Sequence, residues 1–188
     1  SEETDVIPKP MVRIGNVPIL RHIMNYYAKF GHTDFIIALG YKADVILEYF
    51  NQVTLNEPEL SWKIQLVDTG LQTATGGRIK RLENLLESEF LLTYGDGVSD
   101  IDIEGLLSSH RKSNNVATLT AVQPPARFGA LNLSGNQVVS FQEKPEGDGA
   151  WVNGGFFALT PKIFDYLGGD NSSLEIDTLP KVASDGKL

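Results

Sequence analysis

Short apolar runs alternate with helical patterns through the first two thirds of the chain. Residues 34–40, 63–67 and 90–92 are apolar runs of the kind that form buried strands. Segments 19–30 and 103–112 instead carry apolar residues at helical spacing, and they lie before or after such runs. This alternation predicts an α/β fold in which a parallel sheet has helices on both faces.

The last third of the chain follows a different pattern. Residues 130–133, 138–141 and 151–159 read as strands separated by turns that contain Gly, Asn or Pro. Antiparallel pairing is therefore expected here. The sequence shows no internal repeat, low-complexity tract or linker, and 188 residues are enough for one domain with a substantial core. We expect residues 1–188 to belong to a single domain.

Charge and cysteine content exclude several functions. The net charge of −8 argues against nucleic acid as a partner, because duplex binding needs an extended basic face. The absence of cysteine excludes disulfides, thiolate nucleophiles and zinc–thiolate sites. No segment reaches the ~18 apolar residues of a membrane span, and no signal peptide opens the chain. These features predict a soluble, cytoplasmic protein that binds neither nucleic acid nor membranes.

The run at residues 90–92 leads into Asp96, which lies between Gly95 and Gly97. Glycines at the end of a strand let the backbone turn sharply and approach a ligand closely. In open α/β sheets, ligands bind at this carboxyl edge. A lone carboxylate there suits Mg²⁺, which usually takes one or two protein carboxylates together with substrate phosphates. The alternative is an ordinary solvated turn.

Three further groups could carry chemistry. Pro8-Lys9-Pro10 holds a cation in a stiff loop, because both prolines restrict the backbone. Gly76-Gly77-Arg78 places backbone donors at the start of a helix, where an anion or a base edge could bind. Glu143-Lys144-Pro145 closes a strand with an adjacent carboxylate and ammonium. The alternatives are an exposed lysine, a capped helix and a solvated strand end.

Asn153-Gly154-Gly155 interrupts a segment otherwise rich in large apolar residues. Glycine weakens a strand, so the pair indicates close approach by a ligand or by another part of the backbone. Asn153 could then hydrogen-bond a hydroxyl-rich substrate through its donor and its acceptor. The three histidines, His22, His32 and His110, show no metal-ligand spacing, and we expect structural or surface roles for them.

These motifs, taken in order, resemble those of the sugar-phosphate nucleotidylyltransferases. The resemblance runs nearly end to end, and its finer details are similar to the glucose-1-phosphate cytidylyltransferase branch. The segments that carry it are Pro8-Lys9-Pro10-Met11, residues 67–70, Thr75-Gly76-Gly77-Arg78, Tyr94-Gly95-Asp96-Gly97, residues 127–131 and residues 141–157.

The resemblance implies a Rossmann-like three-layer α/β fold with a mainly parallel sheet and an antiparallel C-terminal portion. It implies transfer of a cytidylyl group from CTP to glucose 1-phosphate, giving CDP-glucose for surface polysaccharides and pyrophosphate. Such a reaction needs no protein nucleophile, only positioning and charge neutralisation. Two alternatives stay open: another nucleoside triphosphate or hexose phosphate as substrate, and a non-catalytic nucleotide-sugar binding protein.

The resemblance also implies roles for single residues. Asp96 would hold Mg²⁺, and Lys9, Asp96 and Lys144 would be catalytic. The remaining expected contacts fall into a nucleotide set, Lys9, Thr75, Gly76, Gly77, Arg78, Gly95 and Asp96, and a sugar-phosphate set, Gly129, Glu143, Lys144, Asn153 and Gly154.

Two features of the family are expected to be missing from residues 1–188. One is the first strand with its glycine-rich phosphate loop, and the other is a C-terminal part that carries the second metal carboxylate. We therefore expect these residues alone to fold poorly and to be inactive. The sequence leaves the oligomeric state open, a homo-oligomer included.

Overall fold

The computed structural model describes residues 7–124, 130–142 and 151–188. The elements in chain order are η2 (Lys9–Met11), β1 (Arg13–Ile14), β2 (Val17–Pro18), α1 (Ile19–Lys29), β3 (Asp34–Leu39), α2 (Ala43–Asn56), β4 (Lys63–Asp68), α3 (Thr75–Lys80), η3 (Glu83–Leu85), β5 (Phe90–Thr93), α4 (Ile103–Lys112), β6 (Ala117–Val122), β7 (Ala130–Ser134), β8 (Gln137–Gln142), β9 (Val152–Leu159), η4 (Pro161–Asp165), η5 (Leu174–Thr178) and α5 (Leu179–Ser184).

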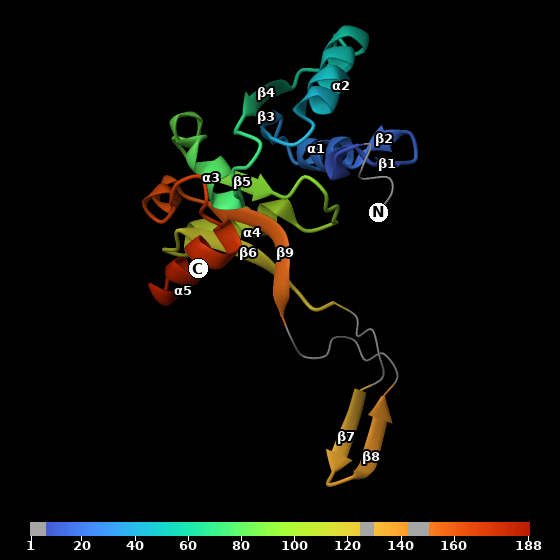
Figure 1. Cartoon of the computed structure of the whole chain (residues 1–188), viewed down its shortest axis with the longest axis vertical. Helices are drawn as coiled ribbons and strands as arrows, with labels where there is room; N and C mark the ends of the chain where they lie inside the picture. Colours follow the sequence, from blue (N-terminus) through green and yellow to red (C-terminus); the bar gives the residue numbers. More distant parts are fainter. Residues whose placement is uncertain (1–6, 125–129, 143–150) are drawn as a thin grey trace.

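β3 and β4 form the parallel part of the structure (Figure 1). They pair in register from Asp34 opposite Lys63 to Leu39 opposite Asp68. The helices α1 and α2 bury their apolar faces together with β3. The buried residues of this cluster are Met11, Leu20, Met24, Leu39, Ile46, Phe50 and Val53.

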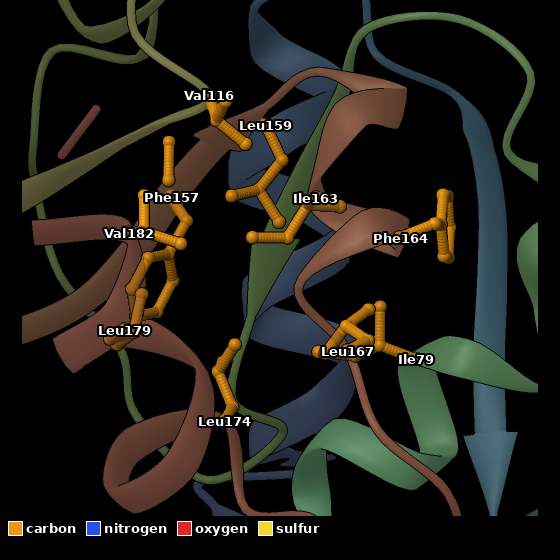
Figure 2. Close-up of a cluster of buried hydrophobic side chains, with 11 residues drawn as sticks. Ile79, Val116, Phe157, Leu159, Ile163, Phe164, Leu167, Leu174, Leu179 and Val182 are labelled. Atoms are coloured by element: carbon orange, nitrogen blue, oxygen red, sulfur yellow. The ribbon is translucent and has the colours of Figure 1, made fainter. Parts of the chain in front are cut away.

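β9 lies between β5 and β6 and runs antiparallel to both. Its side chains alternate between two helical layers, as expected for a strand buried on both faces. Phe157 and Leu159 are 0% exposed and pack with residues of η4, η5 and α5 (Figure 2). Phe156 and Ala158 pack with residues of α1 and α4. The predicted α/β class with helices on both faces of the sheet is confirmed.

β3 and β5 both line one cavity but do not pair with each other within the described part of the chain. Between them lies a cavity of about 500 Å³, lined by Ile36 and Ile37 of β3 and by Leu91 and Leu92 of β5. The expectation that a central strand is missing from residues 1–188 stays a prediction.

β7 and β8 form an antiparallel hairpin that extends away from the other elements (Figure 1). Leu131, Leu133 and Phe141 are more than half exposed on it. This hairpin and β9 are the antiparallel segments that the sequence predicts. In the described segments, no helix has the length and apolar character needed to cross a bilayer.

The helices α2 and α3 differ in length. α2 continues to Asn56, because Val53 extends the apolar stripe of Ile46 and Phe50 and is buried with them. α3 ends at Lys80, and the 3₁₀ turn η3 follows.

Candidate active site

Asp96 lies three residues after the last residue of β5, at the carboxyl end of that strand. Both Asp96 and Gly97 are exposed, whereas Tyr94 and Gly95 are half-buried. The strand is held against β9 by pairing from Phe90 to Thr93, so the turn begins from a fixed position. The structure therefore presents the Asp96 carboxylate to solvent at the edge where the sequence predicts a ligand.

The lysine loop lies next to this turn. Lys9–Met11 forms the single turn η2, closed by a 2.8 Å hydrogen bond from the Met11 N–H to the Pro8 carbonyl, and buried Met11 anchors it. The Cγ atom of Pro10 lies 3.1 Å from the point that a Cβ on Gly95 would occupy. A side chain at Gly95 would crowd the loop, so glycine here lets the Lys9 loop and the Asp96 turn meet. Lys9 itself is exposed.

The two glycines at the start of α3 pack against the chain's own backbone. A Cβ on Gly76 would lie 2.7 Å from the Ser172 carbonyl oxygen, and one on Gly77 would lie 2.7 Å from Asp170 Cα. The Gly77 N–H donates to Ser172 O at 3.1 Å. Both positions therefore need glycine for packing alone. Their predicted contact with a nucleotide stays a prediction.

Arg78 holds the ends of two strands together. Its guanidinium donates to the carbonyls of Leu39 at 3.1 Å, Gly70 at 2.7 Å and Leu71 at 3.3 Å, and to the Thr69 hydroxyl at 2.8 Å. These acceptors lie at the carboxyl ends of β3 and β4. Arg78 thus fixes the backbone at these two strand ends. Its predicted contact with the base also stays a prediction.

The glycine pair of β9 permits close approach by two groups, another part of the backbone at Gly154, as the sequence predicts, and the Tyr94 ring at Gly155. Gly155 has φ +77°, and a Cβ on it would lie 2.7 Å from the Tyr94 ring. A Cβ on Gly154 would lie 2.9 Å from the Thr120 carbonyl oxygen. Asn153 Oδ1 accepts from the Gly155 N–H at 2.8 Å, and its Nδ2 donates to the Tyr94 hydroxyl at 3.4 Å. The structure therefore brings exposed Asn153 to the Asp96 turn.

Two residues of this site carry no role in the sequence analysis, Tyr94 and Glu175. The Tyr94 hydroxyl donates to Glu175 Oε1 at 2.6 Å. Burial, this hydrogen bond and the nearby carboxylates raise the pKa of Tyr94 to about 12, so it is neutral at physiological pH. Tyr94 stands inside a motif and could have been examined. Glu175 lies 81 residues from Tyr94 in an ordinary polar segment, and no sequence pattern marks it.

The single carboxylate of Asp96 suits Mg²⁺ better than it suits a metal ion whose ligands all come from protein side chains. Among the described residues, no three His, Cys, Asp or Glu side chains form a metal-binding group. Both Glu175 oxygens accept hydrogen bonds from neutral donors, which leaves the exposed Asp96 as the carboxylate open to a cation. One carboxylate with substrate phosphates is the coordination that Mg²⁺ commonly takes.

The three histidines are held by structural contacts. His22 Nε2 lies 2.9 Å from the Ile14 carbonyl oxygen, and His110 Nδ1 lies 2.8 Å from the Thr118 hydroxyl. His32 lies 3.4 Å from Glu104. Three other predicted site residues, Gly129, Glu143 and Lys144, lie outside the described residues, and their predicted contact with a sugar phosphate stays a prediction.

Two known cytidylyltransferases are similar to the whole chain. The chain is 46% identical to the glucose-1-phosphate cytidylyltransferase of Salmonella typhi over 207 aligned residues, which cover 100% of the chain and 80% of that enzyme. It is 42% identical to the probable glucose-1-phosphate cytidylyltransferase of Bacillus subtilis, with 100% and 81% coverage.

The fold is shared with solved structures. HddC from Yersinia pseudotuberculosis superposes with a TM-score of 0.70 at 29% identity, covering 93% of this chain and 77% of HddC. A putative glucose-1-phosphate thymidylyltransferase from Bacillus anthracis gives a TM-score of 0.71 at 18% identity, with 99% and 78% coverage. The model of the family described as Nucleotidyl transferase matches residues 4–188. The chain belongs to the nucleotidyl transferase family.

Proposed function

We propose that this protein is a Mg²⁺-dependent enzyme that transfers a cytidylyl group from CTP to glucose 1-phosphate, giving CDP-glucose and pyrophosphate. The observation that carries this proposal is the 46% identity, over the whole chain, to the Salmonella typhi cytidylyltransferase. The geometry supports it, because the Lys9 loop meets the Asp96 turn at the carboxyl end of β5.

The reaction is an in-line substitution at phosphorus. A phosphate oxygen of glucose 1-phosphate attacks the α-phosphorus of CTP, and the bond between that phosphorus and the α–β bridging oxygen breaks. Pyrophosphate leaves with the bonding electron pair. No protein nucleophile takes part, so the enzyme's contribution is to orient two anions and to offset their repulsion.

Each charged residue has a distinct part in this proposal. Lys9, on its short anchored loop, contacts the triphosphate, and Lys144 contacts the sugar phosphate. Asp96 would hold Mg²⁺, which would supply positive charge beside the phosphate oxygens. A protein of net charge −8 can bind these anions because the local charges at the site outweigh the distant ones.

The remaining site residues contact the nucleotide and the sugar in this proposal. Thr75, Gly76, Gly77 and Arg78 present the start of α3 to the nucleotide. Asn153 is exposed beside Tyr94, where its amide can exchange its 3.4 Å bond for a glucose hydroxyl. The sugar side is completed by Gly129, Glu143 and Gly154.

The experiment is pyrophosphate release by the full-length protein. CTP, glucose 1-phosphate and Mg²⁺ are supplied together, and each is then omitted in turn, with EDTA added where Mg²⁺ is omitted. We expect pyrophosphate and CDP-glucose in equal amounts only when all three are present. A nucleotide-sugar binding protein without activity would bind CTP or CDP-glucose and release no pyrophosphate. That result would contradict the proposal.

A further inference from the structure

The Glu175 carboxylate joins two segments of the site that are far apart in the sequence. Its Oε2 accepts from the Thr75 hydroxyl at 2.7 Å, across 100 residues, and from the Ser173 hydroxyl at 2.9 Å. Its Oε1 accepts from the Tyr94 hydroxyl at 2.6 Å, across 81 residues. One half-buried side chain thus links the start of α3 to the residue before Gly95.

The hydrogen bonds on both sides of Glu175 all donate toward its carboxylate. The Leu174 N–H donates to the Thr75 hydroxyl at 2.9 Å, and that hydroxyl donates its own proton to Glu175. From the other side, Asn153 donates to the Tyr94 hydroxyl at 3.4 Å, and Tyr94 donates to Glu175. Both hydroxyls therefore use their single proton on the carboxylate, which requires an acceptor on each of its oxygens.

The attachment of this segment to α3 does not depend on Glu175. The Ala74 N–H donates to the Asp170 carbonyl at 2.7 Å, and the Gly77 N–H donates to the Ser172 carbonyl at 3.1 Å. Arg81 also forms two hydrogen bonds with the Asp170 carboxylate, at 2.9 and 2.6 Å. What Glu175 adds is the link to Tyr94, and hence to the Asp96 turn.

The charge of Glu175 suits this link. Burial raises the pKa of its carboxyl, and hydrogen bonds from Tyr94, Thr75 and Ser173 act in the other direction and leave the pKa below the usual value. The group is ionised at neutral pH and accepts on both oxygens. Charge-assisted hydrogen bonds of this kind are short and directional, so they fix the positions of their donors.

We propose that Glu175 is a positioning residue for the transfer reaction, holding the start of α3 and the Asp96 turn at the separation that the reacting phosphates require. This inference rests on the proposed function. Glu175 contacts no substrate in this proposal; it acts through Tyr94 and Thr75. Its loss should therefore lower the rate at the reacting centre more than it weakens substrate binding.

The test compares Glu175→Gln with Asp177→Asn in the full-length protein. Glutamine supplies one acceptor oxygen where glutamate supplies two, so the acceptor is lost either to Tyr94 or to both Thr75 and Ser173. Asp177 is the matched control, because its carboxylate lies in the same segment and, among the described residues, accepts only from the Ser173 N–H, at 2.7 Å. We expect Glu175→Gln to lower kcat by about 10- to 100-fold with KM for CTP within about threefold of wild type. Asp177→Asn should keep kcat within about threefold.

The possible results distinguish failure of the proposed function from failure of the positioning role of Glu175. Wild-type protein that releases no pyrophosphate overturns the proposed function itself. Active wild type, with folded Glu175→Gln no slower than Asp177→Asn, overturns only the positioning role. If Glu175→Gln does not fold, Tyr94→Phe decides, since it removes one end of the link and keeps the ring. A kcat at least about fivefold lower supports the role, and wild-type kcat overturns it.

Discussion

On one side of the candidate site, Lys9 and Asp96 are exposed, and neither side chain hydrogen-bonds another residue of the described chain. On the other side, Arg78 donates to four oxygen atoms, and Glu175 accepts from three hydroxyls. The first side is free to meet a substrate. The second is the held side, which comprises Arg78, Glu175 and the residues packed around them. Its residues are already hydrogen-bonded to the protein, so they act by holding the backbone in place.

The largest effect should come from Asp96→Asn on the exposed side. Removing one group that stabilises charge in the transition state typically lowers turnover by about 10²- to 10³-fold. Because Asp96 is exposed and unpaired in the described structure, the free energy of unfolding should stay unchanged. Pyrophosphate release and urea unfolding measure the two effects. Asp100→Asn, an exposed carboxylate four residues away, should leave both unchanged. Full activity in Asp96→Asn would remove Asp96 from the site.

Gly155→Ala should cause the largest loss of stability on the held side. A left-handed conformation costs a residue with a Cβ about 1–2 kcal/mol, and crowding the Tyr94 ring adds about 1–3 kcal/mol. Gly186→Ala is the matched control: its φ is +65°, and no atom lies within 4 Å of the added Cβ. The difference between the two variants in urea unfolding isolates the contact with Tyr94. Equal losses of unfolding free energy in the two variants would show that the Tyr94 ring does not crowd the added Cβ.

Arg78→Lys should be the next most harmful change. An ammonium cannot reproduce the planar set of donors, and losing hydrogen bonds from a charged group costs about 1.5–3 kcal/mol. Arg13→Lys, an exposed arginine with one hydrogen bond to Asn16 O, should change unfolding little. If Arg78→Lys instead left stability unchanged and raised KM for CTP, Arg78 would belong with the substrate-binding side.

The smallest effect should come from titration of Tyr94. Its folded pKa, about 12, lies above its ordinary value of 10.0, so its contribution to stability is complete below pH 10. That contribution is lost as the pH rises from 10 to 12. Tyr94 is only partly buried, so solvent screens the effect. The fall in the thermal midpoint of unfolding from pH 9 to pH 11 should be smaller in Tyr94→Phe than in wild type. An equal fall would contradict the shifted pKa.

The held side also shows where sequence reasoning stops. Apolar runs and helical spacing predicted β3, β4, β5 and α4, and Asp102 caps α4 by accepting from the Gly105 N–H. These features depend on residues close together in the chain. The packing reason for Gly76 and Gly77 lies about 95 residues away, at Asp170 and Ser172.

The link through Glu175 needs the same long-range information. Two of its three donors stand 100 and 81 residues away, and only folding brings them to one carboxylate. Motifs thus pointed to exposed residues that stand beside each other once the chain folds, such as Lys9 and Asp96. They gave no indication of Glu175, which links the start of α3 to Tyr94.

The cytidylyltransferase assignment is tested most directly by nucleotide choice. The full-length protein is supplied with glucose 1-phosphate, Mg²⁺ and, separately, CTP, UTP, GTP, ATP or dTTP, and the initial rate of pyrophosphate release is measured for each. We expect kcat/KM for CTP to exceed that for every other nucleotide by about tenfold or more, equivalent to roughly 1.4 kcal/mol of discrimination. Equal values for CTP and UTP would contradict the assignment.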